Sequence, residues 1–291
     1  MASILVIGGT RFFGKKLVKR LIDHGDTVTV MTRTSLPPEF QGYVNHLQCD
    51  RTNFEDFKTT IGAKTFDIIY DNINYSPQEA TQTIEVFAQS NPRYIFTSTL
   101  SVHDMDGRAK VENDFDPTTY PLIAGDSSQF DYGEGKRQAE AAYFQKAAFP
   151  VVAVRFPMVL GEDDYTQRLL FHIERIEQQK TIAFVNLDAE MGFIHSDEAA
   201  DFLFWAGRET FTGPIHAASH GQISMQSLIS LIEHKTTMQA MITNADDEKN
   251  LSPFAIPQSW YMNTDYAASL GFSFSTLDDW LPSLIEKLKN N

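Results

Sequence analysis

Residues 3–14 read SILVIGGTRFFG, and this stretch decides the fold. Its first five residues form a short apolar run that ends in glycine, which is typical of a strand buried on both faces. After the glycines, apolar residues recur at helical spacing: Leu17, Val18, Leu21 and Ile22. Residues 27–31 then alternate threonine and valine, as a second strand does. The beginning of the chain therefore predicts a strand, a glycine turn, a helix and a second strand.

The same alternation of strand and helix patterns continues along the chain. Further strands are predicted at 44–47, 66–70, 93–97 and 151–154, and helices at 53–61, 76–89 and 132–148. Repeated strand and helix units with β-branched strands predict an α/β fold with a doubly wound parallel sheet, the Rossmann arrangement.

After Phe156 the pattern loosens into helices with short strands at 193–195 and 215–218. We expect a sheet domain at 1–155, with 193–218 returning to it. Residues 156–192 and 219–291 are expected to form a smaller C-terminal lobe that binds substrate over the carboxyl ends of the strands. Residues 104–129 contain scattered charges, glycines and prolines and little periodicity. This segment is predicted to be a mobile active-site loop.

Composition narrows the class of protein. The chain has 291 residues, 42% of them hydrophobic and 21% charged, which is typical of a globular protein. The net charge of −14 disfavours nucleic acid as a partner, because phosphate backbones are repelled. No apolar run approaches the roughly 20 residues of a membrane helix, and the first residues do not resemble a signal peptide. A single cysteine, Cys49, excludes an internal disulfide and fits a reducing compartment, so we expect a cytoplasmic protein.

A buried strand, a glycine turn and a helix N-terminus together form a site for an anion. Glycines let the backbone approach a pyrophosphate, while free N–H groups and the helix dipole favour negative charge. The residues predicted to hold a dinucleotide here are Gly8, Gly9, Thr10, Arg11, Phe12, Phe13 and Gly14. Arg11 stands where the spacing G-x-x-G-x-x-G would place the middle glycine, and its guanidinium can hydrogen-bond phosphate.

The end of the second strand indicates which dinucleotide is bound. Residues 31–35 read MTRTS and contain no carboxylate for a ribose 2′-hydroxyl, whereas Arg33 is placed to pair with a 2′-phosphate. The sequence therefore favours NADP over NAD, although Arg33 could also be a solvated loop residue. Asp50, after the third strand, is a candidate for the adenine edge, but aspartate is common after strands.

Tyr132 and Lys136 are spaced so that they share one face of a helix. A free tyrosine titrates near 10, but a cation about 4 Å away contributes about 4 kcal/mol at an effective dielectric constant of about 20. This interaction would bring the pKa of the phenol to about 7, suitable for proton transfer. A surface pair without a role is the alternative. Gly133 and Gly135 are poor helix formers, and we expect them to leave room for a ligand.

A third member of the site is expected at the end of the fifth strand, because a hydroxyl there can donate to a substrate oxygen. Residues 96–101 read FTSTLS and offer several candidates. From the residues alone, the choice between them stays open.

Taken together, these segments resemble the NAD(P)-dependent epimerase/dehydratase family, the extended branch of the short-chain dehydrogenases. The similar segments are IGGTRFFG at 7–14, YIFTSTLSVH at 94–103, the Tyr132 and Lys136 pair, RFPMVLG at 155–161, FIHSD at 193–197 and LGF at 270–272. The resemblance implies hydride transfer, with Thr99 binding the substrate oxygen, Tyr132 as acid and base, and Lys136 lowering the pKa of Tyr132 and holding the ribose. It also implies that the backbone around Pro157 meets the nicotinamide.

Many members of this family act on nucleotide sugars, and many dimerise through the helices predicted at 76–89 and 132–148. Two alternatives stay open, a non-catalytic NAD(P)-binding regulator and an RNA-binding relative. The intact set of Thr99, Tyr132 and Lys136 disfavours the first, and the charge disfavours the second. Residues 71–74 read DNIN where the family usually has small alanines. No metal site is expected, because the histidines lack a familiar ligand spacing.

Overall fold

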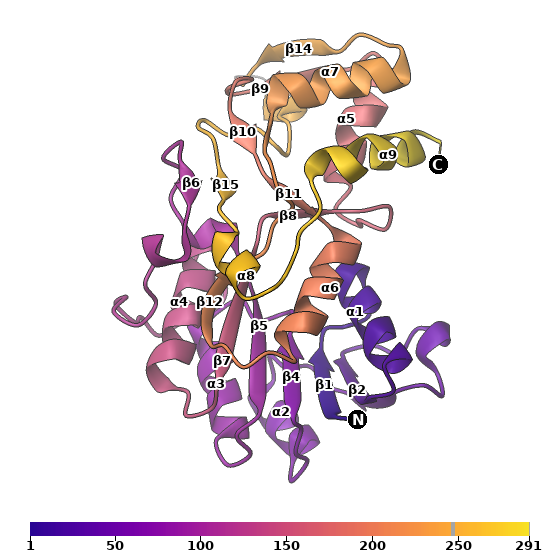
Figure 1. The fold of residues 1–291 in the computed structure, drawn as a ribbon. Coiled ribbons are helices and arrows are strands. Elements are labelled where there is room, and N and C mark those ends of the chain that lie inside the picture. Colours follow the sequence, from indigo (N-terminus) through magenta and orange to yellow (C-terminus); the bar gives the residue numbers. More distant parts are fainter. Residues whose placement is uncertain (246–247, 291) are drawn as a thin grey trace. The chain divides into compact units, whose positions relative to one another are not determined.

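A computed structural model describes residues 1–245 and 248–290. Its largest sheet has seven strands (Figure 1). The strands are β1 (Ser3–Ile7), β2 (Thr27–Thr32), β3 (Asn45–Gln48), β4 (Ile68–Asp71), β5 (Arg93–Thr99), β7 (Val151–Phe156) and β12 (Gly213–His216). Their order is β12-β7-β5-β4-β1-β2-β3, and every neighbouring pair is parallel. The prediction of a doubly wound parallel sheet is therefore confirmed, with the order reversing between β1 and β4.

Helices cover both faces of this sheet. They are α1 (Phe12–Asp23), α2 (Phe54–Ile61), α3 (Pro77–Phe87), α4 (Tyr132–Lys146) and α6 (Ser196–Ala206). Helices α2, α3 and α4 share one apolar core with alternate strand residues such as Leu5 and Ile7. A Cβ added to Gly9 would meet both Val6 and Val18, which places α1 on the opposite face of the sheet.

The chain divides into two compact units, the first at 1–103, 112–156 and 199–216, and the second at 104–111, 157–198 and 217–291. Two boundaries differ from those expected. The strand β11 (Phe193–His195) pairs with β8 (Met158–Leu160) inside the second unit, so the return to the sheet begins at 199 instead of 193. The strand β6 (Ala109–Lys110) pairs with β15 (Tyr261–Met262), which assigns 104–111 to the second unit. Pairing partners this distant in sequence leave no local signal.

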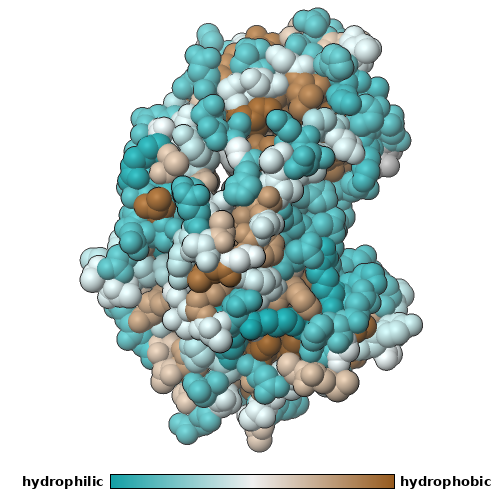
Figure 2. All heavy atoms as spheres, in the orientation of Figure 1, coloured by the Kyte–Doolittle hydropathy of each residue, from teal (hydrophilic) through white to brown (hydrophobic). Residues whose placement is uncertain are grey.

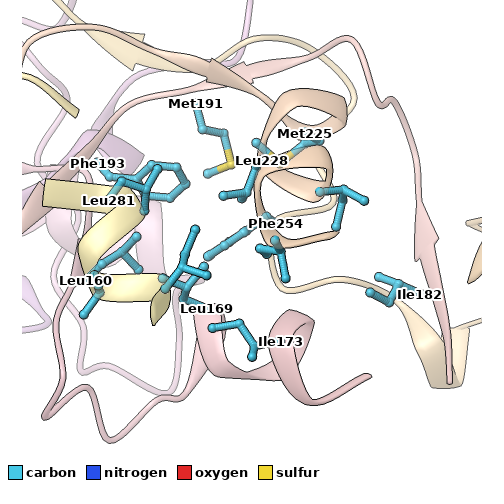
Figure 3. Packing of buried hydrophobic residues seen from close by; sticks show 14 of the residues in the cluster. Leu160, Leu169, Ile173, Ile182, Met191, Phe193, Met225, Leu228, Phe254 and Leu281 are labelled. Atoms are coloured by element: carbon cyan, nitrogen blue, oxygen red, sulfur yellow. The ribbon is translucent and has the colours of Figure 1, made fainter. Parts of the chain in front are cut away.

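The second unit has its own hydrophobic core. Its helices are α5 (Arg168–Glu177), α7 (Met225–Thr236), α8 (Asp265–Ser269) and α9 (Leu277–Lys289), and its other short strands are β9 (Thr181–Phe184), β10 (Glu190–Met191), β13 (Ile223–Ser224) and β14 (Met241–Asn244). Figure 3 shows side chains from these elements converging, among them Leu169, Phe193 and Leu228. This separate core explains why the sequence pattern changes after Phe156.

A histidine lies buried in this second core. His172 is stacked between the rings of Phe184 and Phe254, at centroid distances of 5.9 and 4.7 Å. Its ring nitrogens bond to the carbonyl of Arg168 and the hydroxyl of Ser252. Burial lowers the pKa of His172 to about 4, so the folded protein holds this imidazole neutral at pH 7.

We expect acid to destabilise the protein through His172. The unfolded chain binds this proton below about pH 6.5, whereas the folded state binds it only below about pH 4. The free energy of unfolding should therefore fall by about 3 kcal/mol between these values on account of this residue. Urea unfolding at pH 7 and pH 4 should show a correspondingly smaller drop for His172→Gln. The exposed His234→Gln is the control, and an unchanged drop in His172→Gln would contradict the prediction.

Part of the segment expected to be a mobile loop, residues 117–123, is hydrogen-bonded to side chains of α4. Gln138 accepts a hydrogen bond from the N–H of Ile123 and donates to the carbonyl of Pro121. Gln145 donates to the carbonyls of Pro117 and Tyr120. Side-chain amides thus satisfy the backbone of residues 117–123, which has no repeating pattern of its own, and mobility of the segment stays a prediction.

Much of α4, one of the two helices expected at a dimer interface, is covered within the protein. From Gly135 to Tyr143 every residue of α4 except Arg137 is buried within the protein. The other helix expected at a dimer interface, α3, keeps exposed side chains at Gln78, Thr81 and Glu85. A homodimer through both helices stays a prediction.

Hydrophilic residues cover most of the face in Figure 2, in keeping with the net charge of −14. Across residues 1–245 and 248–290, no helix is both long and apolar enough to cross a membrane.

Candidate active site

The candidate site of the first unit lies at the carboxyl edge of its sheet. The strand order reverses between β1 and β4, and the chain leaves these two strands at Gly8 and Asn72. Open α/β sheets bind ligands beyond the strand ends at such a point.

The glycine turn after β1 is closely packed. Gly8 has φ of +76°, which favours glycine, and a Cβ there would lie 2.4 Å from Ile73. A Cβ on Gly14 would lie 3.1 Å from the carbonyl oxygen of Gly8. Glycine therefore suits both positions, as in a turn that receives a phosphate.

The N-terminus of α1 follows this turn. Within the described chain, no side-chain hydrogen bond caps the helix at Arg11, and its first turn contains no acidic residue. Phe12 has φ of +49°, an uncommon conformation for a residue with a side chain. The helix dipole at this end, with no acidic side chain in the first turn, suits an anion site. Phe13 packs against Phe156 at a ring distance of 5.7 Å.

The two residues predicted at the adenosine end lie beside each other. Arg33 is exposed directly after β2, and its charge is one cause of the lowered pKa of Asp50. The larger cause is hydrogen bonding from Thr52, whose hydroxyl and N–H both donate to the Asp50 carboxylate. Asp50 therefore caps its own turn as well as facing Arg33.

The hydroxyls at the end of β5 differ in where their hydrogen bonds lead. Ser98 donates to Glu140 inside the core, and Thr97 donates to Asn72 at 2.7 Å. Thr99 ends β5 and accepts from the N–H of Ser101 at 3.1 Å. Thr99 and Ser101 are therefore the hydroxyls at the strand end, in agreement with the position inferred from the family resemblance.

Lys136 is buried, with 2% of its surface exposed, and its ammonium lies at the same edge. The Nζ atom donates to the carbonyl of Asn74 at 2.7 Å and to that of Thr97 at 2.8 Å. The rings of Tyr75 and Phe96 lie 4.6 and 4.8 Å away. Burial lowers the pKa of Lys136 to about 8, so the amine is mostly charged at pH 7.

Tyr132 begins α4 one turn before Lys136, with Asp131 as the helix cap. Tyr132 is 55% exposed, and the centroid of its ring lies 6.0 Å from Nζ of Lys136. The structure thus places the phenol at the surface of the site and the ammonium behind it. The ammonium bonds to main-chain carbonyls, and no hydrogen bond to the phenol is among its contacts in the described residues.

The expectation that Gly133 and Gly135 leave room for a ligand was wrong. A Cβ on Gly133 would lie 2.6 Å from the carbonyl of Ser101, and one on Gly135 would lie 2.5 Å from that of Tyr75. The two glycines let the strand ends approach the first turn of α4. This packing places the first turn of α4 against Ser101 and Tyr75.

Asn72 and Asn74 are site residues that the motifs missed. The Asn72 side chain donates to the carbonyl of Gly8 and accepts from the Thr97 hydroxyl, so it joins the glycine turn to β5. The carbonyl of Thr97 on that strand accepts a hydrogen bond from Lys136. Asn74 supplies one of the two carbonyls that bind the ammonium. The only signal in the sequence was the polar run at 71–74, which departs from the family pattern.

Arg155 begins the segment predicted to meet the nicotinamide, but its side chain points into the core. It is fully buried and bonds to both carboxylate oxygens of Glu140, at 2.6 and 3.0 Å. It also donates to the carbonyls of Glu112 and Phe115. Pro157, which follows β7, is buried and belongs to the second unit. Among the described residues, no group of three or more His, Cys, Asp or Glu side chains is placed to hold a metal.

Comparison with known proteins identifies the family of this chain. The sequence model of the NAD dependent epimerase/dehydratase family matches residues 4–218. A curated relative, the chloroplast stem-loop binding protein of 41 kDa b from Arabidopsis thaliana, is 29% identical over 114 residues. This match covers 35% of the present chain and 30% of the relative, so it spans less than a third of that protein.

Solved structures share the fold at low sequence identity. The UDP-glucuronic acid 4-epimerase from Bacillus cereus, in complex with UDP-glucuronic acid and NAD, is 19% identical with a TM-score of 0.77, and 99% of each chain is covered. The UDP-glucose 4-epimerase from Thermus thermophilus, in complex with NAD, is 14% identical with a TM-score of 0.72, and 99% of this chain and 97% of that chain are covered. At these identities the likeness concerns the fold alone.

Proposed function

The chain belongs to the NAD dependent epimerase/dehydratase family, and from this premise we propose that it is an oxidoreductase or epimerase. In this proposal, hydride transfer takes place between a nicotinamide dinucleotide and a small hydroxyl or carbonyl substrate. Nucleotide sugars are the proposed substrate class, because the epimerases from Bacillus cereus and Thermus thermophilus act on UDP-sugars. Cytoplasmic location and a homodimer stay predictions.

One observation carries the proposal. A buried ammonium, an exposed phenol and a strand-end hydroxyl meet at the edge that also bears the glycine turn. The turn suits a pyrophosphate because Gly8 and Gly14 let the end of β1 lie close to the N-terminus of α1, where the helix dipole favours negative charge. A structural lysine alone would not need an exposed phenol one helical turn away.

The proposed roles follow from where each polar atom lies. When bound, a nicotinamide ring supplies a hydride donor or acceptor. The Tyr132 hydroxyl exchanges a proton with the substrate oxygen, while the Thr99 hydroxyl orients that oxygen. The Lys136 ammonium favours the ionised phenol through its charge, because a nearby cation stabilises an anion. The proposed cofactor residues are Gly8, Gly9, Thr10, Arg11, Phe12, Phe13, Gly14, Arg33, Asp50 and Pro157.

Arg33 is proposed to favour NADP over NAD, since it is exposed at the end of β2 and no carboxylate follows that strand. Titration with NADPH and NADH, followed by intrinsic fluorescence, should show tighter binding of NADPH. Replacement of Arg33 by alanine should weaken NADPH binding by about tenfold or more, because a charge-assisted hydrogen bond is lost. NADH binding should change little.

Lys64→Ala is the matched control, because it removes an exposed cation of the same unit that precedes the amino end of β4. Equal weakening of both cofactors in Arg33→Ala would contradict the 2′-phosphate role. Binding of neither cofactor to the unaltered protein would overturn the enzyme proposal. Turnover would then be sought with UDP-glucose and UDP-glucuronic acid as the first substrates.

A second candidate is RNA binding, favoured by the local identity with a chloroplast stem-loop binding protein. The net charge of −14 opposes it. Salt-sensitive binding of a stem-loop RNA, together with no cofactor binding, would support this candidate instead.

A further inference from the structure

A chain of buried polar side chains lies behind Lys136, between the sheet and helices α3 and α4. The amide of Asn74 donates to the hydroxyl of Tyr143 at 2.7 Å, and the hydroxyls of Tyr143 and Tyr94 are 2.8 Å apart. The Tyr94 hydroxyl donates to Asp71 at 2.5 Å. At most 1% of the surface of each of these four residues is exposed.

The hydrogen bonds of this chain run in one direction. Burial, and then the Asp71 carboxylate, raise the pKa of both Tyr94 and Tyr143 far above the neutral range, so both phenols keep their protons. The Asn74 amide donates a hydrogen bond to the Tyr143 hydroxyl, and the Tyr94 hydroxyl donates one to Asp71. The Tyr143 hydroxyl therefore donates the hydrogen bond between the two tyrosines. Aligned hydrogen bonds polarise one another, and the series ends on a carboxylate.

The carboxylate at the end of the series is itself held from other sides. Arg51 donates to Asp71 at 2.5 Å, and the N–H of Ile73 donates to its second oxygen at 3.1 Å. A buried ion pair of this kind adds little net stability compared with apolar packing. The stability gained by packing α3 and α4 on the sheet therefore does not by itself explain why Arg51 and Asp71 are polar.

Asn74 connects this chain to the candidate site. Its side-chain amide begins the series, while its main-chain carbonyl accepts a hydrogen bond from the Lys136 ammonium. Fixing the side chain of Asn74 thus fixes the carbonyl that the ammonium uses. Asp71 also lies close enough to favour the charged form of Lys136 electrostatically.

We propose that Tyr143, Tyr94 and Asp71 are positioning residues for Lys136: they fix Asn74 against the ammonium and place a carboxylate charge behind it. The proposal rests on the proposed function for its catalytic meaning. Its structural content, that the buried chain keeps the amine protonated, can be measured without cofactor or substrate.

The charged groups around Lys136 oppose one another. Burial disfavours the ammonium most strongly, Asp71, Glu79 and Glu140 favour it, and Arg51 disfavours it. The resulting pKa of about 8 means that a small loss of support changes the fraction of charged amine near neutral pH. Tyr143→Phe removes one hydroxyl from the chain and keeps the ring.

The test is a pH titration of the Lys136 amine by nitrogen NMR in cofactor-free protein, with the signal assigned by Lys136→Met. The unaltered amine should be half protonated at about pH 8. In Tyr143→Phe, proton affinity should fall by about fivefold, because the hydrogen bond from the ammonium to Asn74 is loosened. Tyr94→Phe should also lower the proton affinity of the Lys136 amine. This variant tests the proposal if Tyr143→Phe does not fold.

Tyr70→Phe is the matched control. Tyr70 is a buried tyrosine next to Asp71 on β4, and its hydroxyl lies against Gly207 on the opposite face of the sheet. This variant should leave the titration of Lys136 unchanged. A folded Tyr143→Phe protein with the unaltered titration, or an equal shift in Tyr70→Phe, would overturn the proposal.

Failure of the proposed function would be visible separately. It would appear as no binding of NADPH or NADH, with the NMR titration unaffected. If turnover is found, the loss of activity at alkaline pH should begin at a lower pH in Tyr143→Phe, in step with the NMR shift. An alkaline limb that does not follow the NMR shift would contradict the positioning role.

Discussion

Replacing Tyr132 by phenylalanine should lower turnover by about 10²- to 10⁴-fold, because the variant keeps the ring and loses the group proposed to transfer the proton. Tyr132 is 55% exposed, so the substitution should leave stability within about 0.5 kcal/mol. NADPH and NADH binding should also be nearly unchanged. Initial rates with the substrate found in the UDP-sugar screen, together with cofactor titration, measure both effects.

Tyr266→Phe is the control for this experiment, since Tyr266 is a partly exposed tyrosine on α8 in the second unit. It should keep full turnover. A Tyr132→Phe protein with turnover within about threefold of the unaltered protein would remove Tyr132 as the acid and base, since a positioned proton donor contributes far more. Ser101 and Thr99 would then be the hydroxyls to test.

Replacing Arg155 by leucine should destabilise the protein by about 3–5 kcal/mol, the largest effect on stability that we expect. The substitution leaves the Glu140 carboxylate buried without its bidentate partner, and both residues are fully buried. It also removes the donors to the carbonyls of Glu112 and Phe115. Urea unfolding followed by circular dichroism measures the loss.

The double variant Arg155→Leu/Glu140→Leu separates these causes. If the uncompensated charge of Glu140 dominates, removal of both ionic groups should recover at least about half of the lost stability, because an apolar pair can replace a buried ion pair. A double variant as unstable as Arg155→Leu would show that the two carbonyls, and not the carboxylate, account for the loss.

The position of the candidate site could be predicted from sequence order. The pattern of strand, glycine turn and helix at 3–14 indicated a parallel sheet, and the carboxyl ends of parallel strands must meet at one edge. Thr99, Tyr132 and Lys136 follow elements that reach this edge. Order along the chain thus predicted the edge for Tyr132 and Lys136, whereas Thr99 was singled out among the hydroxyls of residues 96–101 only by the family resemblance.

The partners of these residues could not be predicted. The sequence argument paired Lys136 with Tyr132 directly, whereas the ammonium bonds to the carbonyls of Asn74 and Thr97. Main-chain carbonyls have no sequence signature. Likewise, Gly133 and Gly135 suggested space for a ligand, and only the packing of the strand ends against α4 shows that backbone fills this space.

By itself, then, the sequence determined the sheet, its winding and the family, because these depend on periodicity and order along the chain. The tertiary structure decided which buried polar groups meet: Asn74 with Tyr143, 69 residues apart, and Arg155 with Glu140 on a neighbouring element. Such pairs depend on the register of strands and the placement of helices. A buried polar group must find a partner within about 3 Å, and only the packed chain specifies which one is there.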